Sequence, residues 1–126
     1  MYILKVVATM VCFLVLDALW IGLFAKPLYA DVLQSLMADR GNLDFALGAI
    51  LAYSMLLLGL FVFVLPSAQP VLYGFIFGVV VYGVYGLTNY VVVDAWTWAL
   101  VLTDWVWGGV LYAATAYFAQ VIGLTS

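Results

Sequence analysis

The 126-residue chain contains no histidine and no glutamate, and it has a single cysteine, Cys12. Without histidine or a second cysteine, the chain lacks the usual ligand sets for zinc, haem and iron–sulfur clusters. The same absences exclude an intrachain disulfide and a nucleophile activated by histidine. We therefore expect no metal site and no cofactor, and an enzymatic activity is disfavoured.

Charge is also scarce. The three cations, Lys5, Lys26 and Arg40, are scattered along the chain, which excludes nucleic acid as a partner. Charged residues make up 7% of the chain, hydrophobic residues make up 70%, and the mean hydropathy is +1.28. Such a chain cannot cover a soluble globule with polar surface, so we predict a single integral membrane domain, residues 1–126, in contact with the lipid bilayer.

Four apolar windows are long enough to cross a bilayer core, which takes about 20 residues. The prolines of segment 66–70 exclude a helix interior there, and Trp96 and Trp98 are typical of an aromatic belt at the membrane surface. The sequence predicts an all-α fold, a four-helix antiparallel transmembrane bundle with both termini on one side. The predicted spans are residues 3–24, 43–65, 71–93 and 99–122.

The one long connection, between the first two spans, has a helical pattern of its own. Leu28, Val32 and Leu36 recur at helical spacing with polar residues between them, which predicts an interfacial amphipathic helix over residues 28–37. We expect this helix to cover one end of the bundle. A surface helix that only anchors the chain is the alternative.

Two aspartates lie inside predicted spans, and both open the pattern Asp-x-x-Trp-x-Gly. The first runs from Asp17 to Gly22 and the second from Asp104 to Gly109. An ionisable group in hydrocarbon is costly, so such residues usually face the interior of a bundle and mark a functional site. Alternatively, the aspartates only fix the register of the helices through hydrogen bonds.

Depth along the predicted helices brings polar residues together. With a rise of 1.5 Å per residue, Asp17, Asn89 and Asp104 fall roughly 6 to 11 Å inside the same membrane face. Tyr53 lies nearer mid-membrane, and glycines 74, 78, 83 and 86 allow close approach of helices beside the site. The candidate residues of a ligand-binding or proton-binding pocket are Asp17, Asn89, Asp104, Tyr82, Tyr85, Thr88, Trp20 and Trp107.

Three stretches carry a resemblance to a known family: Phe13–Gly22, Tyr82–Asn89 and Leu102–Gly109. Here the chain resembles small bacterial membrane proteins grouped as the domain of unknown function 2177 (DUF2177). The resemblance implies the four-span fold, the positions of the motifs and a location in the bacterial inner membrane, and it implies no chemistry. Gly86 stands where the family pattern has an aspartate.

The sequence favours a membrane-embedded protein that binds a small molecule or lipid in an Asp/Asn/Tyr pocket. A transporter coupled to protons or cations is a second interpretation, in which the chain forms a homodimer because four spans are few for alternating access. A third is an accessory subunit of a larger membrane complex, in which the aspartates hold the bundle together.

Overall fold

The computed structural model describes residues 2–25, 42–92 and 96–125, and this part of the chain contains no strand. Four of its helices are long and apolar enough to cross a membrane, and each coincides with a predicted span. The prediction of an all-α fold with four spanning helices is therefore confirmed. The elements are α1 (Tyr2–Trp20), the π-helical turn η1 (Ile21–Ala25), α3 (Asn42–Gly59), the π-helical turn η2 (Leu60–Val64), α4 (Pro70–Val92) and α5 (Trp98–Val121).

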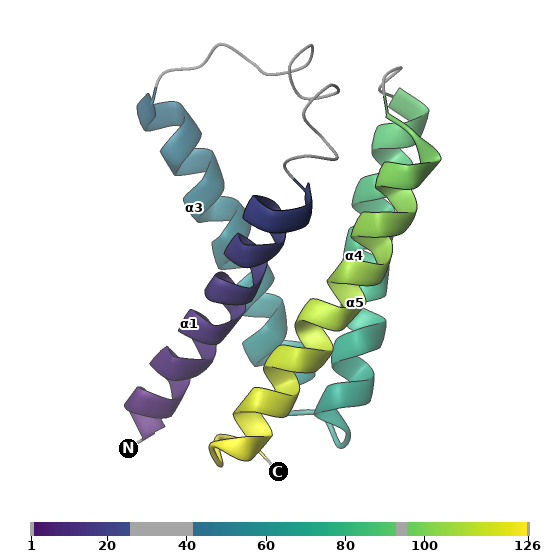
Figure 1. The fold of residues 1–126 in the computed structure, drawn as a ribbon. Helices are drawn as coiled ribbons and strands as arrows, with labels where there is room; N and C mark the ends of the chain where they lie inside the picture. Colours follow the sequence, from purple (N-terminus) through teal and green to yellow (C-terminus); the bar gives the residue numbers. More distant parts are fainter. Residues whose placement is uncertain (1, 26–41, 93–95, 126) are drawn as a thin grey trace.

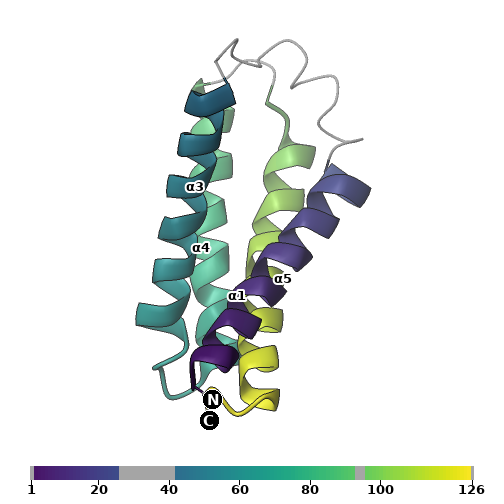
Figure 2. The ribbon, with the colours of Figure 1, turned by 90° about the vertical axis from the view of Figure 1, so that its left-hand side faces the viewer.

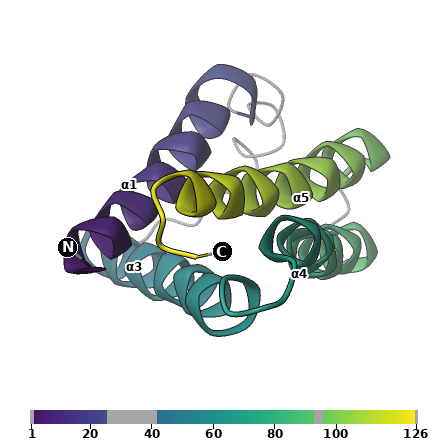
Figure 3. The same ribbon diagram turned by 90° about the horizontal axis from the view of Figure 1, so that it is seen from below.

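Successive helices run in opposite directions, so α1 begins and α5 ends at the same end of the molecule (Figure 1). Viewed along the helices, α5 lies between α1 and α4, and α3 completes the fourth side (Figure 3). The amphipathic helix predicted over residues 28–37 lies outside the described residues. The site described below is built from α1, α3, α4 and α5.

Helices α4 and α5 pack with their backbones close together because glycines line their interface. A Cβ atom at Gly78 would collide with the carbonyl group of Gly108, and one at Gly74 would lie 3.0 Å from the carbonyl oxygen of Tyr112. A Cβ atom at Gly86 would lie 3.5 Å from the Cα atom of Val101, which is an ordinary van der Waals contact. The prediction that glycines on the third span permit close helix approach is confirmed, and glycine on α5 contributes equally.

The main apolar core lies toward the end where α1 begins. Phe13 and Tyr112 are fully buried there, and their rings meet edge to face with centroids 5.3 Å apart. The Tyr112 hydroxyl donates a hydrogen bond of 2.8 Å to the backbone carbonyl of Leu56, which links α5 to α3. A second cluster of Trp96, Leu100 and Val101 lies at the opposite end. Along α5, Asp104 lies between these two clusters, and on α1, Asp17 lies between Phe13 of the first cluster and Trp20, which packs against the second.

Local sequence explains where α4 and α5 begin and how the end of α5 is held. Pro70 begins α4, a position where its missing N–H would have no helical acceptor. Thr97 caps α5 by accepting a hydrogen bond of 3.3 Å from the Leu100 backbone N–H. Thr125 donates a 2.8 Å hydrogen bond to the Leu65 carbonyl, which joins the turn after α3 to the end of α5.

Helices α1 and α3 are held less closely. Figure 2 shows α1 leaning away from α3 toward the end that carries Trp20. The outer faces of both helices are exposed and apolar, as expected for surfaces that contact lipid, and they include Leu4, Val11, Leu47 and Ile50. Their connection to the rest of the bundle depends on a few specific side chains.

Candidate functional site

Asp17 occupies the interior face of α1. It follows Thr9 and Phe13 at four-residue steps, and all three side chains are buried, so one face of the helix turns inward. Only 5% of Asp17 is exposed. Because Asp17 has the same four-residue spacing as the buried residues before it, its side chain lies inside the bundle with them.

Two hydrogen bonds connect Asp17 to other helices. The Tyr53 hydroxyl of α3 donates to Oδ2, and the Trp107 indole Nε1 of α5 donates to Oδ1 at 3.1 Å. An indole N–H can only donate, so Oδ1 acts as an acceptor whatever the protonation state of the other oxygen. Both carboxylate oxygens thus have partners, and a single side chain joins three helices.

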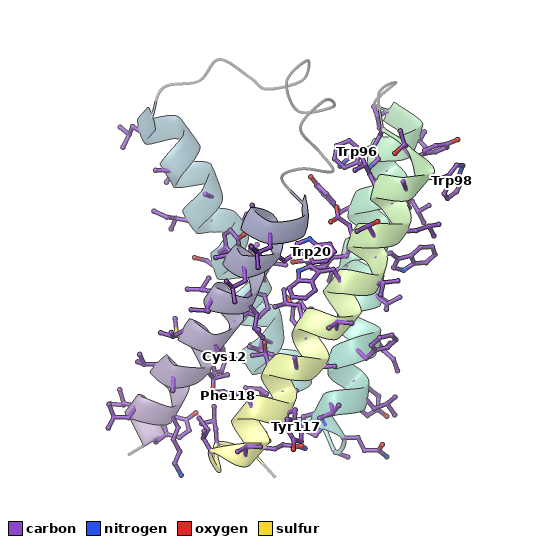
Figure 4. The ribbon with its side chains drawn as sticks, viewed as in Figure 1. Cys12, Trp20, Trp96, Trp98, Tyr117 and Phe118 are labelled. Atoms are coloured by element: carbon purple, nitrogen blue, oxygen red, sulfur yellow. The ribbon has the colours of Figure 1, made fainter. Side chains whose placement is uncertain are left out.

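Trp107 also packs against Trp20, the tryptophan of the first Asp-x-x-Trp-x-Gly motif. Its ring is stacked on Trp20 with centroids 4.7 Å apart and planes 5° from parallel. Figure 4 shows Trp20 reaching from α1 toward α5, with Trp96 and Trp98 at the far end of α5. The two tryptophans of the repeated motif are therefore in direct contact, which the spacing alone did not predict.

An apolar groove borders this tryptophan pair. It is shallow and largely open, with a volume of about 410 Å³. Exposed side chains at four-residue steps on α5, Leu102, Val106 and Val110, form its outer side. The groove is lined by Trp20, Leu102, Thr103, Val106, Trp107 and Val110. Trp107 thus contributes to an apolar surface while its N–H reaches a buried carboxylate.

Asp104 is the second buried carboxylate, with 8% of its surface exposed. It precedes Trp107 by three residues, or about 4.5 Å along α5. Tyr82 and Tyr85 of α4 both lie within electrostatic range of it. Tyr85 is hydrogen-bonded to the side chain of Asn89, one turn along α4.

Tyr82 is common to the surroundings of both aspartates. Its hydroxyl lies within electrostatic range of Asp17 as well as Asp104. The ring packs against Gly108, where a Cβ atom would collide with it, so the glycine makes room for the phenol between α4 and α5. Tyr82 is therefore the phenol that interacts electrostatically with both aspartates.

The predicted residues do not all lie inside the bundle. Thr88 is exposed on α4, and 54% of Tyr85 is exposed, so these two lie toward the outer surface. Tyr53, expected nearer mid-membrane, is instead the direct partner of Asp17. Counted from Ala46, where the apolar span on α3 begins, Tyr53 is about 10 Å deep, which is the signal that would have placed it beside Asp17.

The described part of the chain holds no group of three or more histidine, cysteine or acidic side chains that could bind a metal ion. Cys12 is a half-buried free thiol on α1 (Figure 4). The amine of Lys5 lies near Gly123, at the end of the bundle opposite Trp20. The chemistry of the site is thus that of two carboxylates among phenols and indoles.

The family model for predicted membrane proteins, DUF2177, matches residues 2–121. The chain belongs to the DUF2177 family. The match includes all four spanning helices and every residue of the site, so the site belongs to the part of the chain shared with the family. Neither the curated proteins nor the solved structures gave a match to this DUF2177 member.

Proposed function

We propose that this protein binds a lipid-like amphiphile in the groove beside Trp20 and Trp107, with its polar end directed toward Asp17. The observation that carries the proposal is the double role of Trp107, which lines the groove and donates a hydrogen bond to the carboxylate. An apolar chain in the groove would remove apolar surface from its surroundings. Asp17 would supply the polar group that orients the head.

The location of the groove supports a ligand that arrives from the membrane. Leu102, Val106 and Val110 lie on the outer face of α5 and are exposed. Since lipid surrounds such a face in the bilayer, an apolar chain could enter from the side without crossing water.

Filling the groove tests the proposal. Val106→Trp places an indole among the lining residues, whereas Val84→Trp adds the same bulk on the outer face of α4. The two valines are 61% and 63% exposed, so Val84 is a matched control. Native mass spectrometry after gentle extraction should detect a bound amphiphile on the wild type and on Val84→Trp. We expect Val106→Trp to lose at least about tenfold in affinity, or about 1.4 kcal/mol.

Equal occupancy of Val106→Trp and Val84→Trp by the same molecule would show that the groove is not the binding site. Extraction in a larger assembly, without any bound amphiphile, would instead favour the accessory-subunit interpretation. In that case the exposed face of α5 would be a contact for partner helices rather than for a ligand.

Proton-coupled transport is the second candidate, and it is supported by the position of Tyr82 within electrostatic range of both buried carboxylates. Acidic residues inside membrane spans are typical of proton pathways in pumps and transporters. In liposomes, a transporter would dissipate a pH gradient in the presence of its substrate, and Asp17→Asn and Asp104→Asn would each abolish this activity. A binding protein would leave the gradient intact.

A further inference from the structure

We infer that the beginning of α3, residues 42–52, is a gate that swings about Gly59 and is closed by the hydrogen bond from Tyr53 to Asp17. The inference goes beyond the proposed function, because it needs no ligand in the groove. It assigns a role to α3, which lies outside both the α4–α5 interface and the lining of the groove.

The beginning of α3 has no buried side that holds it in the bundle. Of its described residues from Leu43 to Ala52, all are exposed except Ala49, which is half-buried. Leu43 and Ile50, for example, are 82% and 63% exposed. Because consecutive residues point to different sides of a helix, exposure at nearly every step leaves no packed face. A segment with so few buried contacts opens at a low cost in free energy.

The other end of α3 is fixed. Leu60 and Val64 of the π-helical turn η2 are buried in the main core. Just before them, Gly59 lies against the ring of Phe77, where a Cβ atom would collide. Figure 1 shows α3 converging on α4 toward η2 and diverging from it toward residue 42. The change from the exposed Leu58 to the buried Leu60 places the pivot at Gly59, beside a π turn of the kind often found at functional sites.

Distance from the pivot explains why Tyr53 can hold the gate. Tyr53 lies six residues before Gly59, or about 9 Å along the helix, and Leu43 lies sixteen residues before it, or about 24 Å. A tilt of about 10° at Gly59 would move Leu43 by about 4 Å and Tyr53 by about 1.6 Å. A lengthening of that size breaks a hydrogen bond between hydroxyl and carboxylate oxygens. The bond from Tyr53 to Asp17 therefore forms only when the gate is closed.

A second hydrogen bond to α3 lies too close to the pivot to act as a latch. The Tyr112 hydroxyl donates a 2.8 Å bond to the backbone carbonyl of Leu56, three residues before Gly59. The same tilt would move that carbonyl by only about 0.8 Å, so the bond persists in both positions of the gate. Only a contact that differs between two states can shift their equilibrium. Tyr53 and Tyr112 thus form a matched pair, of which Tyr53 alone controls the gate.

Opening the gate would change the surroundings of Asp17. Its Oδ1 would keep the hydrogen bond from Trp107 of α5, and its Oδ2 would lose the bond from Tyr53. Helices α1 and α3 would then part at the level of the carboxyl group, where their outer faces contact lipid. A group that enters from the membrane between these two helices would have to displace Tyr53 to reach Asp17. The gate therefore controls lateral access to the aspartate.

Distances between spin labels, measured by double electron–electron resonance on the full-length chain in lipid nanodiscs, test the gate. One pair joins Leu47→Cys on the gate to Val84→Cys on α4, and a second pair joins Val62→Cys in η2 to the same site on α4. All three positions are exposed, and Cys12→Ala removes the native thiol. We expect the Leu47 pair to show a second distance, about 3 Å from the first, and the Val62 pair to show a single narrow one.

Two tyrosine variants then identify the latch. Tyr53→Phe should raise the ratio of open to closed gate about threefold, which is the effect of one hydrogen bond inside a membrane. Tyr112→Phe makes the same chemical change near the pivot and should leave the ratio unchanged. An unaltered Leu47 distribution in Tyr53→Phe, or equal broadening of both label pairs, would overturn the gate. If Tyr53→Phe does not fold, the wild type decides, since equally narrow distributions for the two pairs would also overturn it.

Discussion

The two halves of the bundle are held together by different means. Between α4 and α5, glycines let the backbones approach so closely that a Cβ atom at Gly78 would collide with Gly108. Helix α1 leans away from α3, and Asp17 joins it to Tyr53 of α3 and Trp107 of α5. One half thus depends on the absence of side chains, and the other combines an apolar core with hydrogen bonds from a few particular side chains.

The α4–α5 interface and the Asp17 tether differ in what they offer: the first contributes mainly packing, and the second also offers polar groups. A glycine interface contributes van der Waals contacts over its full length and offers no group to a ligand. A tether made of a carboxylate, a phenol and an indole contributes less packing, yet it presents hydrogen-bonding groups beside a groove. Under the proposed function, the loosely packed half is therefore the half in which a ligand would bind.

The largest effect should come from the glycine interface. Gly78→Ala would force α4 and α5 apart, and we expect a loss of about 3 kcal/mol in the free energy of unfolding in mixed micelles. Gly48→Ala is the matched control, because a Cβ atom there would have no neighbour within 4 Å. It should be neutral, or more stable by about 0.5–1 kcal/mol. Similar losses in both variants would contradict the close packing of α4 on α5.

An intermediate effect should follow loss of the tether. Asp17→Leu leaves the Tyr53 hydroxyl and the Trp107 N–H without this acceptor, so we expect unfolding to become easier by about 1–2 kcal/mol. Asp17→Asn retains an acceptor for the indole and should remain within about 0.5 kcal/mol of the wild type. If both variants match the wild type, α1 is held by its apolar contacts alone.

The smallest effect should come from one hydroxyl. Tyr53→Phe removes a single hydrogen bond, which in a membrane protein is worth about 0.6 kcal/mol. In the Asp17→Leu background the same change should have no effect, because the acceptor is already absent. Tyr112→Phe is the control, since its hydroxyl donates to the Leu56 carbonyl and its effect should be the same in both backgrounds. Any coupling between Tyr112 and Asp17 would show that the tether extends further.

The fold was predictable because a bilayer imposes it. Each span needs about 20 apolar residues, and the prolines of segment 66–70 and the polar residues around Arg40 separate four such runs. The close approach at Gly74 and Gly78 was also predictable, since small residues at four-residue spacing mark helix interfaces in membranes. These features depend on composition and spacing along one helix at a time.

The hydrogen-bond partners of Asp17 could not be predicted from the sequence. Counting residues gives the depth of Asp17 along its helix, but the rotation of one helix relative to another depends on packing over the whole interface. For this reason Tyr53 was expected nearer mid-membrane and was not identified as a donor to Asp17, and Trp107 was predicted as a pocket residue without its hydrogen bond to that aspartate. The stacking of Trp20 on Trp107 has the same origin.

The Asp17 tether also has a consequence for the order in which the protein is made. Asp17 is made 36 residues before Tyr53 and 90 residues before Trp107, so α1 can reach the membrane with its carboxyl group before the Trp107 donor has been made. An aspartate at the centre of a helix opposes insertion by about 2.5–3.5 kcal/mol. The strong hydropathy of α1 offsets this, whereas the less hydropathic α5, with Asp104, arrives when the glycine face of α4 is already in place. The more apolar of the two aspartate-bearing helices is thus the one that is made first.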